Sequence, residues 1–238
     1  MLKAVTFDLW NTVIREKSKN NIEGVVNTRL SNVLFQHNVR LSLKEIENVT
    51  TRCRNKVMML QVKEGKEMPP DAQITWILDE LNVTATDGLV ADLYEAYTTS
   101  TLEEMPEPVP GVALVLAELR DSFDIALICN TGRTPGTVAR QILERLRLKQ
   151  HFSHLIFSDE IGVAKPNPKI FHEALTALGV RPEEAVHIGD DPRTDVKGAR
   201  NIGMKAAWLP RGGQVTDVEC DVIVHNWKDF LTWVKERV

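Results

Sequence analysis

The chain has 238 residues, enough for one large domain or two small ones. Its apolar fraction of 43% and its charged fraction of 26% are typical of a soluble globular protein. The formal net charge of −4 gives no electrostatic support for nucleic-acid binding, and no apolar run approaches the length needed to span a bilayer.

The cysteines and the N-terminus exclude further classes of protein. Cys53, Cys129 and Cys220 are far apart and odd in number, so neither a disulfide framework nor a zinc site is expected. The first residues, Met-Leu-Lys, lead directly into a strand and lack the apolar core of a signal peptide. We therefore expect a cytoplasmic protein with free thiols.

The first predicted element is a strand over residues 3–7, a short apolar run that ends at Asp8. From about residue 16 to 104, apolar residues recur at helical spacing. Ser42 with Glu45 forms a capping-box signature, and Asp71 is expected to cap the following helix. We predict four amphipathic helices that bury their apolar faces as a bundle.

A proline-rich segment at residues 106–111 predicts a hinge or domain boundary. Beyond it, strand and helix patterns alternate, with strands expected at residues 124–129, 155–157, 185–188, 205–209 and 221–224. This alternation predicts a doubly wound parallel α/β sheet with helices on both faces.

Two domains follow from this organisation. We expect residues 1–15 and 105–238 to form the α/β core and residues 16–104 to form an inserted helical cap. The insertion follows Asp8 and therefore lies over the carboxyl end of the sheet, where it can act as a lid.

Polar residues follow the predicted strands, and loops at the carboxyl ends of parallel strands converge on one crevice. Asp8 ends the first strand, where a carboxylate can attack phosphorus and form an acyl phosphate. Cys129, Asn130, Thr131 and Gly132 end the second, and their small size lets backbone amides reach an anion. Taken alone, each segment is also typical of an ordinary turn.

A lysine and a group of acids complete the candidate site. Lys165 precedes two prolines, and Asn167 can cap the next helix, so the ammonium sits on a stiff segment and could neutralise a nucleophile and a phosphoryl group. Asp190 and Asp191 follow the fourth core strand, and Asp195 comes four residues later. Mg²⁺ would relieve the repulsion between these acids. A solvated lysine and acids favoured by a helix dipole are the simpler interpretations.

In order and position, these segments resemble the motifs of the haloacid dehalogenase superfamily, a group of hydrolases with an aspartate nucleophile. The resemblance covers nearly the whole chain and includes the inserted helical cap. The segments that carry it are Phe7-Asp8-Leu9-Trp10-Asn11-Thr12, Cys129-Asn130-Thr131-Gly132, Ala164-Lys165-Pro166-Asn167-Pro168, and Ile188-Gly189-Asp190-Asp191 with Asp195.

The resemblance implies a role for each candidate residue. It implies that Asp8 is the nucleophile and that Lys165 neutralises the phosphoryl group. It further implies that Asp8, Asp190 and the main-chain oxygen of Trp10 ligate Mg²⁺, and that Asp191 and Asp195 support the metal. Phosphate binding would fall to Cys129, Asn130 or Thr131, together with Lys165.

Two positions depart from the superfamily pattern. Trp10 stands where its phosphatases carry a second aspartate as general acid, and loss of a general acid costs on the order of 10²–10⁴ in rate. The cost falls for a good leaving group, and the cap or the substrate could supply the proton. Cys129 is a weak donor at a position that usually carries a hydroxyl, with Thr131 as the alternative.

We favour a Mg²⁺-dependent phosphohydrolase that acts on a small phosphorylated metabolite through an aspartyl-phosphate. A 2-haloacid dehalogenase is a rival, because those enzymes also lack the second aspartate, but they need no acidic cluster. A phosphonate-cleaving enzyme would need a Schiff-base lysine from the cap, such as Lys56 or Lys63. A non-catalytic Mg²⁺ or phosphate-binding module, with Trp10 blocking the crevice, is the alternative of another class. The oligomeric state stays open.

Overall fold

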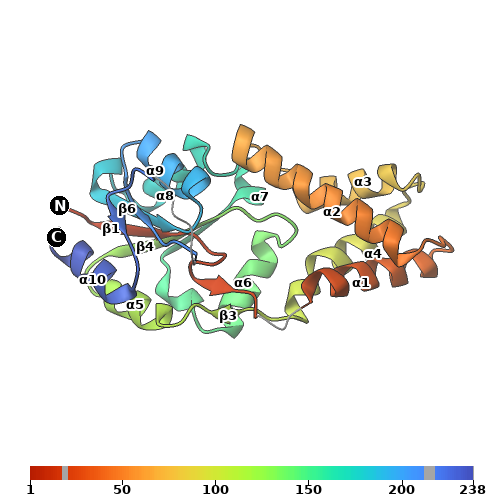
Figure 1. Ribbon diagram of the computed structural model, residues 1–238, viewed down its shortest axis with the longest axis horizontal. Helices are drawn as coiled ribbons and strands as arrows, with labels where there is room; N and C mark the ends of the chain where they lie inside the picture. Colours follow the sequence, from red (N-terminus) through yellow and green to blue (C-terminus); the bar gives the residue numbers. More distant parts are fainter. Residues whose placement is uncertain (18–20, 212–217, 238) are drawn as a thin grey trace.

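A computed structural model describes residues 1–17, 21–211 and 218–237. Its centre is a parallel six-stranded sheet with the strand order β5-β4-β1-β6-β7-β8 (Figure 1). The strands are β1 (Ala4–Phe7), β4 (Asp124–Cys129), β5 (His154–Phe157), β6 (Ala185–Gly189), β7 (Lys205–Trp208) and β8 (Val222–Ile223). This sheet confirms the predicted α/β fold class.

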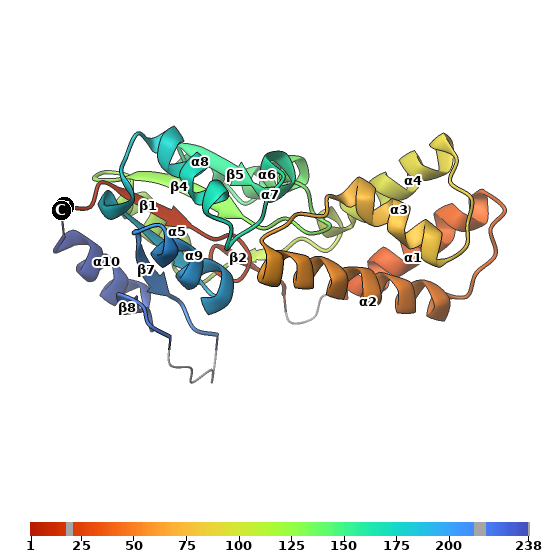
Figure 2. The same ribbon diagram turned by 90° about the horizontal axis from the view of Figure 1, so that it is seen from above.

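Helices cover both faces of the sheet (Figures 1 and 2). One face buries apolar residues of α5 (Val112–Leu119), α6 (Gly136–Arg145) and α10 (Trp227–Lys235). The other buries residues of α8 (Pro168–Leu178) and α9 (Lys197–Asn201), and the short α7 (Ser158–Ile161) follows β5. The central strands β1, β4 and β6 are buried on both faces, which is why they read as continuous apolar runs in the sequence.

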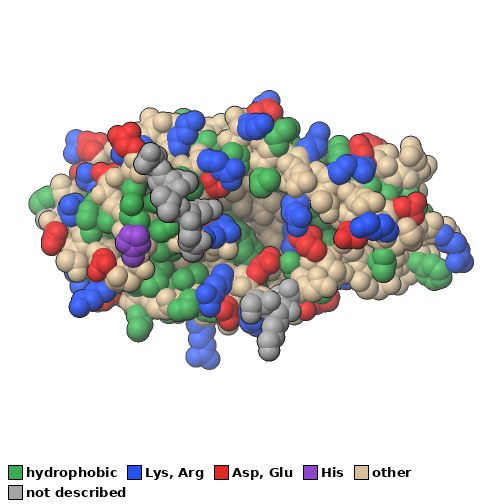
Figure 3. Space-filling model, viewed as in Figure 1, with side chains coloured by type: hydrophobic (Ala, Val, Ile, Leu, Met, Phe, Trp, Pro, Cys, Tyr) green, Lys and Arg blue, Asp and Glu red, His purple; other side chains and the backbone are tan. Residues whose placement is uncertain are grey.

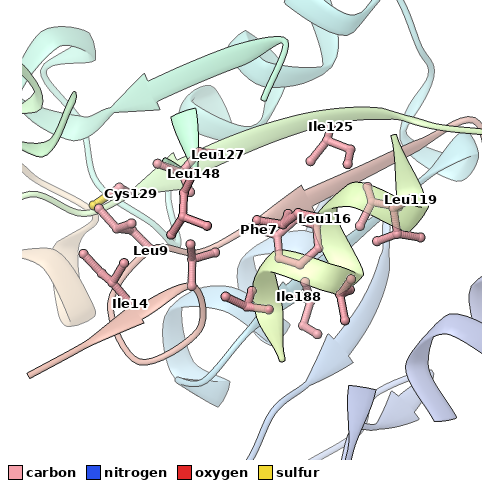
Figure 4. Packing of buried hydrophobic residues seen from close by; sticks show 14 of the residues in the cluster. Phe7, Leu9, Ile14, Leu116, Leu119, Ile125, Leu127, Cys129, Leu148 and Ile188 are labelled. Atoms are coloured by element: carbon pink, nitrogen blue, oxygen red, sulfur yellow. The ribbon is translucent and has the colours of Figure 1, made fainter. Parts of the chain in front are cut away.

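The aromatic ring of Phe7 lies at the centre of the first of these apolar layers. Its side chain is fully buried and makes edge-to-face contacts with Phe152 and Phe230, with ring centroids 6.3 Å apart in both pairs. Figure 4 shows Phe7 of β1 beside Leu116 of α5. Because Phe7 directly precedes Asp8, this packing fixes the end of β1 and with it the start of the site.

Four helices form a separate apolar cluster beyond one end of the sheet (Figure 2). They are α1 (Ile22–Gln36), α2 (Leu43–Met59), α3 (Pro70–Glu80) and α4 (Asp87–Thr98), and a π-helical turn over Leu60–Glu64 extends α2. No helix in the described ranges has both the length and the apolar character of a membrane span.

The helix starts test the capping expectations. The capping box of Ser42 and Glu45 is confirmed at the start of α2. The expectation for Asp71 is wrong, because α3 begins one residue earlier, at Pro70, and Asp71 lies in its first turn. Proline is favoured at a first helical position because its missing N–H would have no partner there.

A small two-stranded sheet joins the two parts of the molecule. β2 (Ile14–Arg15) and β3 (Glu107–Pro108) pair in antiparallel fashion, and the Val109 amide donates to the Val13 carbonyl at 2.9 Å. The segments that enter and leave the helical part therefore run side by side. β3 lies within the proline-rich segment from which we predicted a boundary.

We expect Phe7→Ala to lower the free energy of unfolding by about 3–5 kcal/mol, because it leaves a cavity between the sheet and its helices. Denaturant unfolding followed by circular dichroism measures this change. Phe35→Ala is the matched control, since Phe35 is 59% exposed and should change the free energy by less than about 0.5 kcal/mol. Equal losses in the two variants would contradict the central place of Phe7.

Candidate functional site

A tight turn after β1 orients Asp8. The amides of Val13 and Ile14 both donate to the Leu9 carbonyl, at 2.9 and 3.0 Å, and Asn11 adopts a left-handed φ of 63°. Asparagine tolerates this conformation better than most residues. The turn brings the Thr12 hydroxyl to Asp8 Oδ2, to which it donates at 3.1 Å. Thr12 belongs to the first motif segment, but no role could be assigned to it from the sequence alone.

Lys165 reaches Asp8 from a loop on another part of the sheet. Its Nζ donates to Asp8 Oδ1 at 2.7 Å, lies 2.8 Å from Asp195 Oδ1, and donates to the Ile128 carbonyl at 2.6 Å. The lysine is 1% exposed. Burial lowers the pKa of Lys165, but Asp195 and Asp8 outweigh it and raise that pKa, so the ammonium stays charged.

The Asn130 side chain holds the backbone of Lys165. Asn130 Oδ1 accepts from the Lys165 amide at 2.7 Å, and Asn130 Nδ2 donates to the Lys165 carbonyl at 3.0 Å. Both polar groups of the amide are thus engaged across the gap between the β4 loop and the Lys165 loop. This arrangement favours a positioning role for the Asn130 side chain rather than the predicted direct contact with phosphate.

The other two predicted phosphate-binding residues are buried at the end of β4. The Thr131 hydroxyl lies 3.1 Å from Ser158 Oγ, and the Thr131 amide donates to the same oxygen at 2.8 Å. Burial, with Asp8 adding to it, raises the pKa of the Cys129 thiol well above its usual range, so the thiol is neutral. Ser158, which orders this loop, follows β5 and carried no motif in the sequence.

The acids after β6 have different partners. Asp195 folds back beneath the strand end, where its Oδ2 accepts from the Asp191 amide at 3.0 Å. Gly189 makes this possible, because a Cβ at that position would lie 2.3 Å from the Asp195 carboxylate. The Asp191 carboxylate turns outward and pairs with Arg193, 2.6 Å from its Nη2.

Asp8, Asp190 and Asp195 form one acidic group. One carboxylate oxygen from each lies within 4.8 Å of the others. Burial raises the pKa of Asp190 to about 7, with Asp8 and Asp195 adding to the rise, and burial raises that of Asp8 to about 6 against the opposing effect of Lys165. Lys165 and the Asp190 partner Arg211 supply two positive charges against three carboxylates. Such a group could hold a metal ion through hard oxygen ligands.

Two residues beside this group were not singled out as site residues from the sequence. Arg211 pairs with Asp190, and a cation near the end of a late strand carries no recognisable motif. His187 is buried in β6 with its ring 2.9 Å from the Thr6 hydroxyl and 3.4 Å from Asp195 Oδ1. Burial lowers the pKa of His187, so the ring is neutral and supports Asp195 without adding charge.

Trp10 lies in the turn after Asp8 and packs, partly buried, against the apolar cluster around Phe7. Its main chain forms a bridge with Ile14. The indole is thus held by the core, while Thr12 and Lys165 occupy the two oxygens of Asp8. The space-filling view shows a hollow between the two parts of the molecule, with both basic and acidic side chains around it (Figure 3).

The helical part touches the loop that carries Lys165. The Gly65 carbonyl accepts from the Ala164 amide at 3.1 Å and from Asn167 Nδ2 at 3.4 Å, and Lys66 forms a bridge with Val163. Gly65 has a φ of 61°, and a Cβ there would lie 2.9 Å from the Asn167 side chain. Asn167 also caps α8, as predicted.

Comparison with known proteins gives consistent matches. A family model of haloacid dehalogenase-like hydrolases matches residues 2–203. A glyceraldehyde 3-phosphate phosphatase from Methanopyrus kandleri is 32% identical over 222 residues, which is 89% of this chain and 85% of the relative. Two solved structures share the fold. One is a 2-haloacid dehalogenase from Pseudomonas syringae, with a TM-score of 0.74 and 21% identity over all of both chains. The other is an HAD phosphatase from Thermococcus onnurineus, with a TM-score of 0.69 and 22% identity over 98% of both chains.

We expect Lys165→Met to lower the free energy of unfolding by about 3–5 kcal/mol, because the buried Asp8 and Asp195 carboxylates lose the ammonium with which both pair. Without the ammonium, the folded-state pKa of Asp8, already raised by burial, rises further, and the pKa of the buried Asp195 carboxyl rises as well. A carboxyl with a raised folded-state pKa stabilises the folded state at low pH, and this stabilisation is lost as pH rises. The loss of unfolding free energy in Lys165→Met should therefore be larger at pH 8 than at pH 5.

Chemical denaturation at the two pH values measures this deficit. Lys169→Met is the matched control, since Lys169 is an exposed lysine four residues further along. A deficit in Lys165→Met that is small, or that does not grow with pH, would show that the buried carboxylates do not depend on Lys165.

Proposed function

Because this chain belongs to the haloacid dehalogenase-like hydrolase family, we propose that it is a Mg²⁺-dependent phosphohydrolase acting on a small phosphorylated metabolite. The observation that carries the proposal is the buried contact of the Lys165 ammonium with both Asp8 and Asp195, 2.7 and 2.8 Å away. A carboxylate held at a strand end beside a fixed cation is suited to attack an anionic phosphoryl group.

The reaction proceeds in two displacements at phosphorus. In the first, an Asp8 carboxylate oxygen bonds to phosphorus as the bond to the leaving group breaks, which gives an aspartyl-phosphate. In the second, water attacks the phosphorus of that intermediate, the bond to Asp8 breaks, and inorganic phosphate leaves. The Asp8 carboxylate is regenerated, the attacking water gives up one proton, and the leaving-group oxygen takes up one proton from solvent, so the atoms balance with water as the second substrate.

The surrounding residues prepare the nucleophile for this attack. Thr12 and Lys165 each hold one oxygen of Asp8, which fixes the carboxylate plane before the substrate arrives. The Lys165 ammonium also stabilises charge on the phosphoryl oxygens, and Asn130 holds the lysine backbone in place. His187 and the Asp191 amide keep Asp195 aimed at the ammonium.

We propose that Asp8, Asp190 and the main-chain oxygen of Trp10 hold the Mg²⁺ ion, with Asp191 and Asp195 in support. The proximity of the three carboxylates and their net negative charge fit a small divalent cation. When bound, the ion would neutralise the acids and polarise the phosphoryl group. Arg211 contacts Asp190, so ligation of a metal ion by the Asp190 carboxylate would compete with this ion pair.

We also propose that residues 16–104 form a cap domain that selects the substrate. Their helices have an apolar cluster of their own and contact the Lys165 loop through Gly65. The name of the Methanopyrus relative refers to a small phosphorylated molecule, which supports a substrate of that class. The chain enters and leaves these helices through the paired segments β2 and β3, and such a connection suits a lid that opens for exchange.

A 2-haloacid dehalogenase is the second candidate function, and the aromatic Trp10 favours it. The shared fold with the Pseudomonas syringae enzyme does not separate the two reactions at 21% identity. The acidic group favours phosphorus, because a departing halide gains nothing from three carboxylates. Chloride release from 2-chloropropionate in the presence of EDTA would decide for the dehalogenase.

We expect Mg²⁺-dependent release of phosphate from acetyl phosphate and p-nitrophenyl phosphate, measured by a phosphate assay. EDTA should abolish the release and added Mg²⁺ should restore it. Asp8→Asn should lower turnover at least about 10³-fold, since it removes the nucleophile while keeping the side-chain shape. Asp121→Asn, an exposed aspartate, is the control. Turnover in Asp8→Asn equal to the wild type would end the proposal.

We expect Trp10→Asp to raise the rate on alkyl phosphates, whose leaving groups need a proton, by up to about 10²-fold, the lower end of the effect of a general acid. The gain should be much smaller on p-nitrophenyl phosphate, whose leaving group departs as an anion. Trp10→Asn keeps the polarity without the acid and controls for removal of the indole. Equal gains in the two variants would mean that the indole, not the missing acid, limits the rate.

A further inference from the structure

A small cavity lies between the helical part and the loop that follows β4. Its volume is about 50 Å³, and all four long cap helices and the loop contribute to it. The residues that line it are Glu23, Val26, Thr50, Arg54, Val57, Gln73, Tyr97, Gly132 and Arg133. One water molecule takes about 30 Å³ of liquid, so the cavity holds a group of a few heavy atoms.

The charges around this cavity do not balance. The Glu23 carboxylate pairs with two guanidinium groups, with one oxygen 2.9 Å from Nη1 of Arg133 and 2.9 Å from Nη1 of Arg54. Burial raises the pKa of Glu23, but Arg133 and Arg54 outweigh it and lower that pKa, so Glu23 is ionised. Two positive charges therefore meet one negative charge.

One of the residues that line the cavity has a buried donor without a partner. Within the described ranges, Nε of Arg133 is buried and makes no hydrogen bond. The neighbouring polar groups are engaged, because Gln73 donates to the Gly132 carbonyl at 3.0 Å and accepts from the Tyr97 hydroxyl at 2.8 Å. A buried N–H without an acceptor is costly, and an anionic ligand would supply one.

The loop connects this cavity to the candidate site. Asn130, which holds Lys165, is two residues before Gly132, so the two ends of this segment are at most roughly 7 Å apart. A substrate that has its phosphoryl group at Asp8 and follows the loop would bring its far end to Arg133.

We propose that this cavity binds a second anionic group, a carboxylate, at the end of the substrate remote from the phosphoryl group. This inference rests on the proposed phosphohydrolase function and narrows its substrates to phosphorylated acids. Arg133 is the principal donor, Arg54 adds charge, and Glu23 sets the net charge of the cavity.

The test compares phosphate esters that differ by one carboxylate. The pairs are 3-phosphoglycerate with glycerol 3-phosphate, phosphoserine with phosphoethanolamine, and 2-phosphoglycolate with ethyl phosphate. We expect at least one pair to show a ratio of kcat/KM of about 10 or more in favour of the acid, the size of one hydrogen bond to a charged group. Calorimetric binding of the same pairs to Asp8→Asn should give the same ranking without turnover.

Three variants separate ligand binding from a structural contact. Arg133→Met should lower the acid-to-neutral ratio about 10-fold or more, whereas Glu23→Gln should raise it, because it leaves the cavity more positive. If the Glu23–Arg133 pair only ties the helices to the core, both variants should weaken turnover of acid and neutral esters alike, and the inference is wrong. Arg52→Met is the matched control, since Arg52 lies on the same helix as Arg54 and pairs with Glu80.

Failure of this inference and failure of the proposed function give different results. If p-nitrophenyl phosphate is hydrolysed through Asp8 but no pair shows a preference for the acid in turnover or binding, the inference fails alone. If no ester is hydrolysed, the proposed function fails, and binding of the pairs to Asp8→Asn still decides whether the cavity recognises a carboxylate.

Discussion

The buried ammonium of Lys165 is the contact on which the site depends. It joins three segments that are far apart in the chain, since Asp8, Asp195 and the Ile128 carbonyl all contact Nζ. Removing a lysine from water costs several kcal/mol, and only a full set of close partners offsets that cost. The ion pairs therefore fix the Asp8 carboxylate and also stabilise the fold, so the geometry of the proposed nucleophile and the folding stability are coupled at one atom.

Much of the fold could be predicted because its central strands are buried on both faces. Such strands appear as short apolar runs, and each of the six runs forms a strand of the sheet. The acids and the lysine that follow these runs could be chosen as candidates because strand ends in a parallel sheet share one edge. The structure brings Asp8, Lys165, Asp190 and Asp195 together, although their roles remain proposals.

The direction of individual side chains could not be predicted, because it depends on neighbours that are distant in sequence. Asn130 follows a strand like any phosphate-binding residue, yet its amide is engaged by the backbone of Lys165. Thr131 is held by Ser158, and Asp191 turns to Arg193. Arg211 reaches Asp190 from a segment without any pattern in the sequence. The spacing of apolar residues in the sequence indicates which segments are buried and where strands end. It does not indicate which distant residue a polar side chain will contact.

The absence of a side chain at Gly189 has a consequence for comparing this protein with its relatives. The backbone at Gly189 does not require glycine through its φ angle. Glycine is required because the folded-back Asp195 side chain occupies the space that a Cβ would need. Any larger residue would leave the strand pairing of β6 intact and displace the carboxylate beneath it. A homologue with an ordinary sheet and a bulky residue at this position would thus look complete in a fold comparison, although its Asp195 carboxylate could no longer lie beneath the strand end and pair with Lys165.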